Sequence, residues 1–345
     1  MKKILIVLSL ISFQASAQDV HFSQFWNNSI QYNPAMAGII PAGFRASAFY
    51  KDQWSSIGAK FNTYGLNLDT RFETKGNTSF GLGLDFYRDV AGDLKLGTTN
   101  AQLAFSTILA IDDHSKISIG IKGGIIQKGF DATQGQWSSQ YQNGSYNGTA
   151  ASGEQFNSVS EIKPDISAGI AYVYSSSERY MTANDVFNLK IGVSYNHILR
   201  PEFDWFANDP IGLYGNIVGH VDMLIGVPNS KWSILPAAIA QFQGPSMEFL
   251  MGSQFRYKLK DASRITGFVK GAYLNLGLFY RWGDSFIPSV TFEFDHYSIG
   301  LSYDVTTSQL RNVSNGAGGF EVSVKFRTPN PYLWQGKTGL RSRFK

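Results

Sequence analysis

Hydrophobic and polar residues alternate along most of the chain with a period of two. In residues 79–88 large apolar residues occupy one set of positions and small or charged residues the other: Phe80, Leu82, Leu84 and Phe86 alternate with Gly81, Gly83 and Asp85. The same alternation recurs in 187–198, 297–306 and 319–327. Because successive side chains of a strand point to opposite faces, the pattern predicts strands with one apolar and one polar face.

Fourteen such strands are predicted, at 42–51, 61–70, 79–88, 97–111, 116–129, 163–174, 187–198, 216–226, 232–242, 246–258, 272–282, 286–295, 297–306 and 319–327. Many have about 9–11 residues, enough to cross a bilayer when tilted, and an even strand number is typical of bacterial single-chain barrels. The sequence therefore predicts an all-β, up-and-down antiparallel outer-membrane barrel over residues 42–327. The strands of a soluble β-sandwich would show the same alternation, so the pattern alone does not tell whether the apolar face meets lipid or a protein core.

Composition favours the membrane barrel over the soluble sandwich. Only 16% of the residues are charged, against about 25% in soluble domains, and 14% are aromatic. No run outside the first 17 residues approaches 18 apolar residues, so the sequence predicts no spanning helix. A chain without such a helix can satisfy its backbone hydrogen bonds in a membrane only as a closed barrel.

Residues 1–17 have the three parts of a secretion signal. Lys2 and Lys3 precede a short apolar run, and Ala15-Ser16-Ala17 forms a cleavage site that would leave Gln18 as the first residue. The chain has no Cys, which excludes disulfides and thiol chemistry. The mature chain is almost neutral, so we expect no nucleic-acid partner.

Loop lengths predict the orientation of the barrel. With the N-terminus in the periplasm, the two longest connections, 130–162 and 199–215, face outward, although 175–186 and 259–271 are longish for inner turns. The second loop carries aromatic candidates for partner contact, since exposed aromatics are enriched in binding hot spots: Phe203, Trp205, Phe206 and Tyr214.

Residues 18–41 precede the first strand and read as neither strand nor helix. They are too rich in aromatics and too poor in charge for a disordered leader, so we expect an ordered periplasmic or plug segment that packs against or inside the barrel. The candidate anchors are Phe22, Phe25, Trp26 and Tyr32, with Asn33-Pro34 setting the turn toward the first strand. The segment either binds a partner or only stabilises the barrel as a lid.

The basic tail, residues 328–345, contains Trp334 and four cations without an acid. It could bind a partner or an anionic surface; a frayed terminus is the alternative.

No catalytic or cofactor motif is present in the sequence. The five His residues are scattered without metal-ligand spacing, so we expect no enzyme, no cofactor and no metal, with a rim hydrolase as a weak alternative. We expect the charges on inward positions to neutralise one another, or otherwise to line a pore: Asp69, Arg71, Asp85, Arg88, Glu248, Arg256, Arg281, Glu293 and Asp304.

Two stretches resemble the PorP/SprF family of type IX secretion system membrane proteins. They are HFSQFWNNSIQYNPAMAG at 21–38 and IGLSYDVTTSQLRNVSNGAGGFEVSVKF at 299–326, and similarity between them covers most of the mature chain. The resemblance implies a non-enzymatic outer-membrane barrel that serves protein secretion, in some members gliding motility and attachment of proteins to the cell surface.

The implied partners are the C-terminal domain of a secreted or adhesin protein, or the periplasmic lipoprotein and ring components of the machine. Segment 19–38 would then line or plug the periplasmic mouth. The competing hypothesis is a diffusion channel for small solutes.

Overall fold

The computed structural model describes residues 19–40, 43–55, 60–142, 144–154, 156, 158–176, 184–206, 209–260 and 271–328. The predicted secretion signal and Trp334 lie outside these residues.

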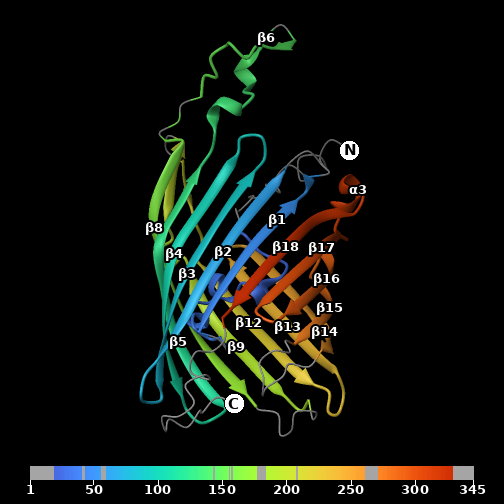
Figure 1. The fold of residues 1–345 in the computed structure, drawn as a ribbon. Coiled ribbons are helices and arrows are strands. Elements are labelled where there is room, and N and C mark those ends of the chain that lie inside the picture. The colour runs from blue at the N-terminus through green and yellow to red at the C-terminus, as the bar shows by residue number, and fades with distance from the viewer. Residues whose placement is uncertain are drawn as a thin grey trace, which may run out of the picture.

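Fourteen strands form one closed antiparallel barrel (Figure 1), as the alternation predicted. The wall consists of β1 (Phe44–Gln53), β2 (Phe61–Glu73), β3 (Thr78–Ala91), β4 (Leu96–Ala110), β5 (Ser115–Gly129), β8 (Ser160–Ser175), β9 (Phe187–Asn196), β12 (Asn216–Gly226), β13 (Trp232–Gln243), β14 (Ser246–Lys260), β15 (Ala272–Arg281), β16 (Ser285–Phe294), β17 (Tyr297–Thr306) and β18 (Ala317–Arg327). Each strand pairs with its chain neighbours, and β1 pairs with β18 to close the ring. In this seam Lys51 lies opposite Glu321.

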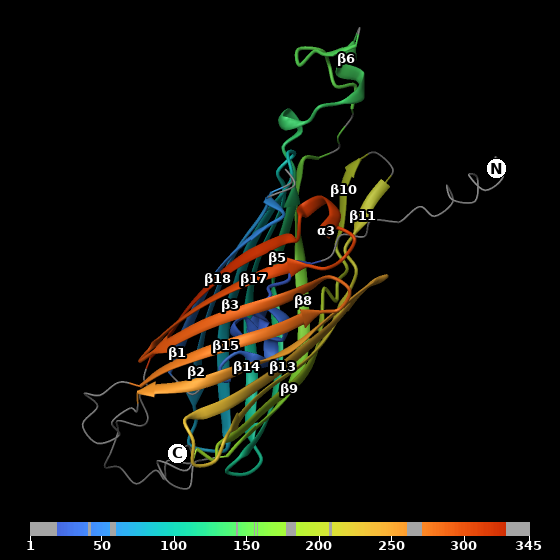
Figure 2. The ribbon, with the colours of Figure 1, turned by 90° about the vertical axis from the view of Figure 1, so that its right-hand side faces the viewer.

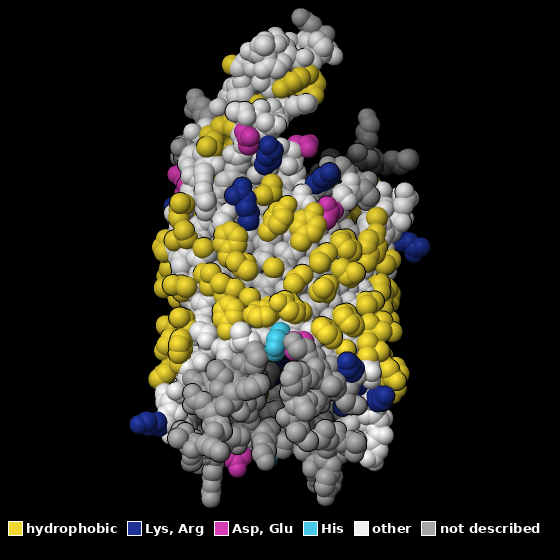
Figure 3. Space-filling view, viewed as in Figure 1, with side chains coloured by type: hydrophobic (Ala, Val, Ile, Leu, Met, Phe, Trp, Pro, Cys, Tyr) yellow, Lys and Arg dark blue, Asp and Glu magenta, His cyan; other side chains and the backbone are white. Residues whose placement is uncertain are grey.

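The barrel is apolar outside and polar inside, the reverse of a soluble domain. On β17 the exposed residues are Ile299, Leu301, Tyr303 and Val305, and the buried ones are Ser298, Ser302, Asp304 and Thr306. Hydrophobic side chains form a broad belt on the outer surface (Figure 3). This arrangement suits lipid outside and a filled polar interior. Within the described residues, the helices are all too short to cross a bilayer.

One sequence prediction on β3 was wrong about the face. Arg88, expected in the lumen, is exposed on the outer wall, whereas its neighbour Tyr87 is buried inside. The reason is the pleat: Asp85 faces inward, so Tyr87 does too and Arg88 faces outward.

The two long connections lie at the same end of the barrel. One carries the hairpin of β6 (Tyr141–Gln142) and β7 (Ser145–Tyr146), which stands away from the wall, and the other carries β10 (Glu202–Phe206) and β11 (Asp209–Gly212) (Figures 1 and 2). A short helix, α3 (Arg311–Ser314), also lies at this end. Long loops face outward in outer-membrane barrels, so we call this the outer end.

The N-terminal segment, residues 19–40, lies inside the barrel (Figure 2). The expectation that it has no helix was wrong, because it forms three single turns: η1 (Phe25–Asn27), α2 (Ser29–Tyr32) and η2 (Pro34–Met36). Asp19 contacts His197 and Asn216, which border the outer ends of β9 and β12. The chain then descends toward the start of β1 at the inner end. The segment therefore runs through the lumen rather than only lining its periplasmic mouth.

Candidate functional site: the occupied lumen

The Asn33-Pro34 pair fixes the turn in the middle of the segment. The Asn33 side-chain oxygen accepts a hydrogen bond from the Ala35 amide at 2.9 Å, which caps η2. Pro34 suits the first position of this turn because its missing N–H would have no partner there. The Asn33 amide nitrogen donates to the carbonyl of Ile170 on β8 at 3.0 Å. These bonds connect the turn to the wall.

The aromatic residues of the segment pack against an apolar patch inside the barrel. Phe25 and Tyr32 belong to one buried cluster with five apolar wall residues and Ala237: Val218, Ile239, Leu250, Phe279 and Ile287. The half-buried Trp26 ring stacks on Phe279 with centroids 4.3 Å apart. Phe22 packs on Phe49 at 5.2 Å. The predicted anchors are thus internal and do not form an exposed surface.

Charged wall residues bind the main chain of the segment near the seam. The buried Glu321 carboxylate accepts hydrogen bonds from the amides of Ser23 at 2.6 Å and Gln24 at 2.9 Å. Opposite it, Lys51 Nζ donates to the His21 carbonyl at 3.0 Å. The segment therefore bridges the first and last strands of the barrel.

Further along, wall side chains bond successive backbone groups of the segment. Lys122 Nζ donates to the Gln31 carbonyl at 2.9 Å and pairs with Asp85 at 2.8 Å. Ser118 Oγ donates to the Ala35 carbonyl and Ser106 Oγ to the Ala37 carbonyl, both at 2.7 Å. The Asp69 carboxylate accepts from the Gly38 amide at 2.9 Å. Most of these hydrogen bonds are made to main-chain atoms of the segment, so they do not depend on which side chains the segment carries.

Glycines on the inner wall make room for the segment. A Cβ built on Gly120 of β5 would lie 2.5 Å from the Ala35 nitrogen and the Pro34 carbonyl carbon. On Gly81 it would lie 2.2 Å from the Ala37 carbonyl oxygen. A strand glycine often marks close approach of another backbone, so inward glycines were the available sequence signal for this contact.

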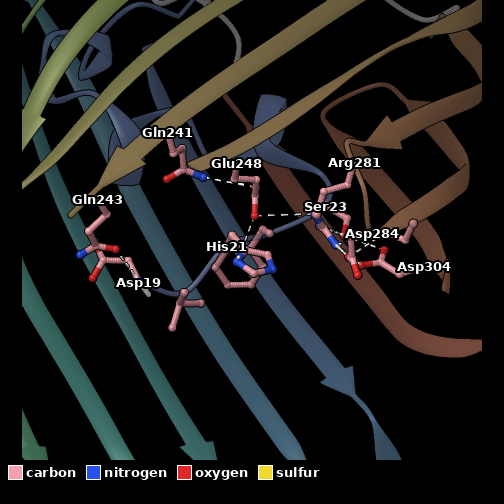
Figure 4. A network of polar contacts seen from close by, with 12 residues as sticks. Asp19, His21, Ser23, Gln241, Gln243, Glu248, Arg281, Asp284 and Asp304 are labelled. Atoms are coloured by element: carbon pink, nitrogen blue, oxygen red, sulfur yellow. Dashed lines mark hydrogen bonds and ion pairs between the residues drawn. The ribbon is translucent and has the colours of Figure 1, made fainter. Parts of the chain in front are cut away.

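Polar side chains of the segment join an ionic cluster on the wall (Figure 4). Arg281 donates to Asp304 at 2.9 Å and to Ser23 Oγ at 3.0 Å, and Ser23 Oγ donates to Asp304 at 2.7 Å. His21 lies 3.3 Å from Glu248. Pairing of lumen charges, favoured from the sequence, is confirmed here and for Arg256 with Glu293, Lys122 with Asp85 and Arg45 with Asp69.

A histidine holds the outer end of the segment. His197 lies just beyond β9, with its ring nitrogens 2.8 Å from Asp19 and 2.8 Å from Asp165 on β8. Burial alone would lower its pKa, but the two carboxylates raise the pKa of His197 to about 10. The imidazole is therefore charged at neutral pH and connects the segment to the wall. A neighbouring cavity has only about 20 Å³, room for roughly one water molecule.

The aromatic candidates of the second outer loop differ in how far they are exposed. Phe203 and Trp205 were expected to be exposed, but they are 0% and 6% exposed. They pack with Ile126 and Leu213, because the loop folds back over the rim. Tyr214 is 44% exposed. The side chain of Phe206 lies outside the described part of the chain. Within that part, no cluster of three or more His, Asp or Glu side chains could hold a metal ion.

Several solved barrel structures are similar to this chain at low sequence identity. The toluene transporter TbuX of Ralstonia pickettii is 12% identical, with 88% of this chain and 94% of that chain covered and a TM-score of 0.45. A FadL homologue of Pseudomonas aeruginosa is 10% identical over 82% and 89%, with a TM-score of 0.44. The β domain of the Bordetella autotransporter BrkA is 10% identical over 83% and 99%, with a TM-score of 0.41.

A comparison with curated proteins gives no match. The family model "Type IX secretion system membrane protein PorP/SprF" matches residues 14–326, which is nearly the whole chain and includes both the segment and the closing strand. The chain therefore belongs to the PorP/SprF family of type IX secretion system membrane proteins and is a β-barrel of the outer membrane.

Proposed function

We propose that this protein is a non-enzymatic binding component of the type IX secretion system. It holds the C-terminal domain of a secreted or adhesin protein at the outer membrane, or connects the barrel to periplasmic lipoprotein and ring components. In this role it serves surface attachment or gliding motility. Family membership supports a role in type IX secretion, and the two long outer loops offer a surface on the side where a secreted protein would be held.

The observation that carries the proposal is the occupied lumen. Segment 19–40 lies inside the barrel and is bonded to the wall from Asp19 to Gly38. A diffusion channel for small solutes, the competing function, requires a continuous water path, and the segment occupies part of the lumen through which that path would run. The occupied state favours a scaffold over a channel.

A native pull-down of the tagged barrel from solubilised outer membranes tests the proposal. We expect co-elution of one large surface protein with its C-terminal domain, or of periplasmic secretion components, identified by mass spectrometry. A variant that lacks residues 136–154 of the first outer loop tests whether this loop contributes to the co-elution. Recovery of no secretion component, together with a steady open conductance in planar bilayers, would overturn the scaffold in favour of the channel.

A further inference from the structure

The segment is seated in the lumen in the manner of a bound peptide. None of its described residues is in a strand, so it contributes nothing to the hydrogen-bond ladder of the wall. All fourteen strands pair with both neighbours without it. Removal of the segment therefore leaves the ring of backbone hydrogen bonds intact.

The wall recognises backbone atoms at both ends of the segment. Glu321 and Lys51 bind the main chain of residues 21–24 at the seam. Ser118 and Ser106 bind the carbonyls of Ala35 and Ala37. Main-chain recognition with a few side-chain pockets is the general way in which proteins bind peptides of differing sequence.

Glu321 shows that the wall is adapted to an occupant. Its side chain is 1% exposed, and both hydrogen bonds found to its carboxylate among the described residues come from the segment. A buried charge needs hydrogen-bonding partners to offset its desolvation. In a lumen without a peptide, this carboxylate would have water as its main partner.

The segment is covalently joined to the barrel wall through its link to β1. Three residues separate Ile40 from Phe44, the first residue of β1, so these four Cα–Cα steps span at most about 14 Å. The other end of the segment lies at the outer end of the lumen. The occupant can thus be withdrawn toward the periplasm without opening any strand pair.

From this geometry we infer that the lumen is a peptide-binding tunnel whose resident ligand is residues 19–40. A partner's polypeptide segment replaces it, offering adjacent backbone amides to Glu321 and an aromatic side chain to the Phe279 pocket. This inference rests on the proposed function only for the existence of a protein partner.

The test severs the segment from a barrel that has already folded. A protease site inserted between residues 40 and 44 of the full-length protein is cut in detergent, so that the segment becomes a ligand in trans. An isotopically heavy synthetic peptide of residues 18–40 is added, and its incorporation is followed by native mass spectrometry. The uncut protein is the control for exchange, and heat-modifiable mobility on gels confirms that the barrel remains folded.

We expect the heavy peptide to replace the severed segment in the cut barrel and not in the uncut one. The S106A/S118A variant removes two hydrogen bonds to the peptide main chain and should raise the dissociation constant about tenfold or more. The matched control is Ser289→Ala, because Ser289 is a buried wall serine whose hydroxyl has no hydrogen-bond partner among the described residues.

Three results would overturn the tunnel: no incorporation by a folded, cut barrel; equal incorporation of a scrambled peptide; or equal weakening by Ser289→Ala. Exchange without any co-purifying secretion component would support the tunnel and refute the proposed function. Co-purification without exchange would support the function and refute the tunnel.

Discussion

Replacement of Gly120 by Ala should expel the segment while sparing the barrel. The new Cβ would lie 2.5 Å from two backbone atoms of residues 34 and 35 and 2.6 Å from a third. Ordinary contact needs about 1 Å more, and all three atoms belong to main chain that is held by its own hydrogen bonds. Overpacking of this kind costs about 1–3 kcal/mol. The ratio of occupied to empty lumen should therefore fall about five-fold to more than a hundred-fold.

The assay uses the absence of Cys from the natural chain. A Ser29→Cys substitution places one thiol on the segment, and its labelling rate by a maleimide reports how often the segment leaves the lumen. Gly219→Ala is the matched control, because a Cβ on this strand glycine meets no atom within 4 Å. Labelling should accelerate with Gly120→Ala and stay unchanged with Gly219→Ala.

A barrel lacking residues 19–40 shows whether the new Cβ of Gly120→Ala clashes with the segment or with the wall itself. In this background Gly120→Ala should be neutral or slightly stabilising, because alanine suits a strand interior better than glycine. If Gly120→Ala lowers the melting temperature equally with and without the segment, the clash lies within the wall and the reasoning is refuted.

Three further predictions follow from the contacts. Arg281→Met should destabilise the full-length protein by about 3–5 kcal/mol in thermal unfolding, because the buried Asp304 then loses its nearest cation and keeps only Lys51, 3.7 Å away; Asp304→Asn added to it should recover part of the loss, and no recovery would contradict the pairing. The raised pKa of His197 means that its bond to Asp19 contributes fully below pH about 6.5 and is lost as the pH rises through about 10; labelling of Ser29→Cys should therefore accelerate in alkali more than labelling of a free thiol does through its own ionisation, and His197→Gln should abolish this excess. Deletion of residues 136–154 should leave the free energy of unfolding within about 0.5 kcal/mol of wild type, and a large loss would show that the outer hairpin supports the barrel.

The strands could be predicted from the sequence because their pattern is local. Alternation predicted fourteen strands and the inward face of most of them, including the position of Asp304, although Arg88 was assigned to the wrong face of β3. The contacts of the segment could not be predicted, since Ser23 and Glu321 are separated by 298 residues and meet only after the ring has closed. The burial of Phe203 and Trp205 could not be predicted for a similar reason, because the sequence of a loop does not show that the loop packs over Ile126.

The seam between β1 and β18 has a consequence for how the barrel assembles. Closing it joins two strands that are separated by almost the whole chain. Contacts between residues so far apart in sequence are slow to form. Lys51 and Glu321 face each other there, and both bind residues 21–24 of the segment. The segment is synthesised first and lies beside β1 along the chain, so it can present ready partners to β18 as the last strand arrives. We therefore expect removal of the segment to slow closure and insertion of the barrel even where the finished barrel is stable.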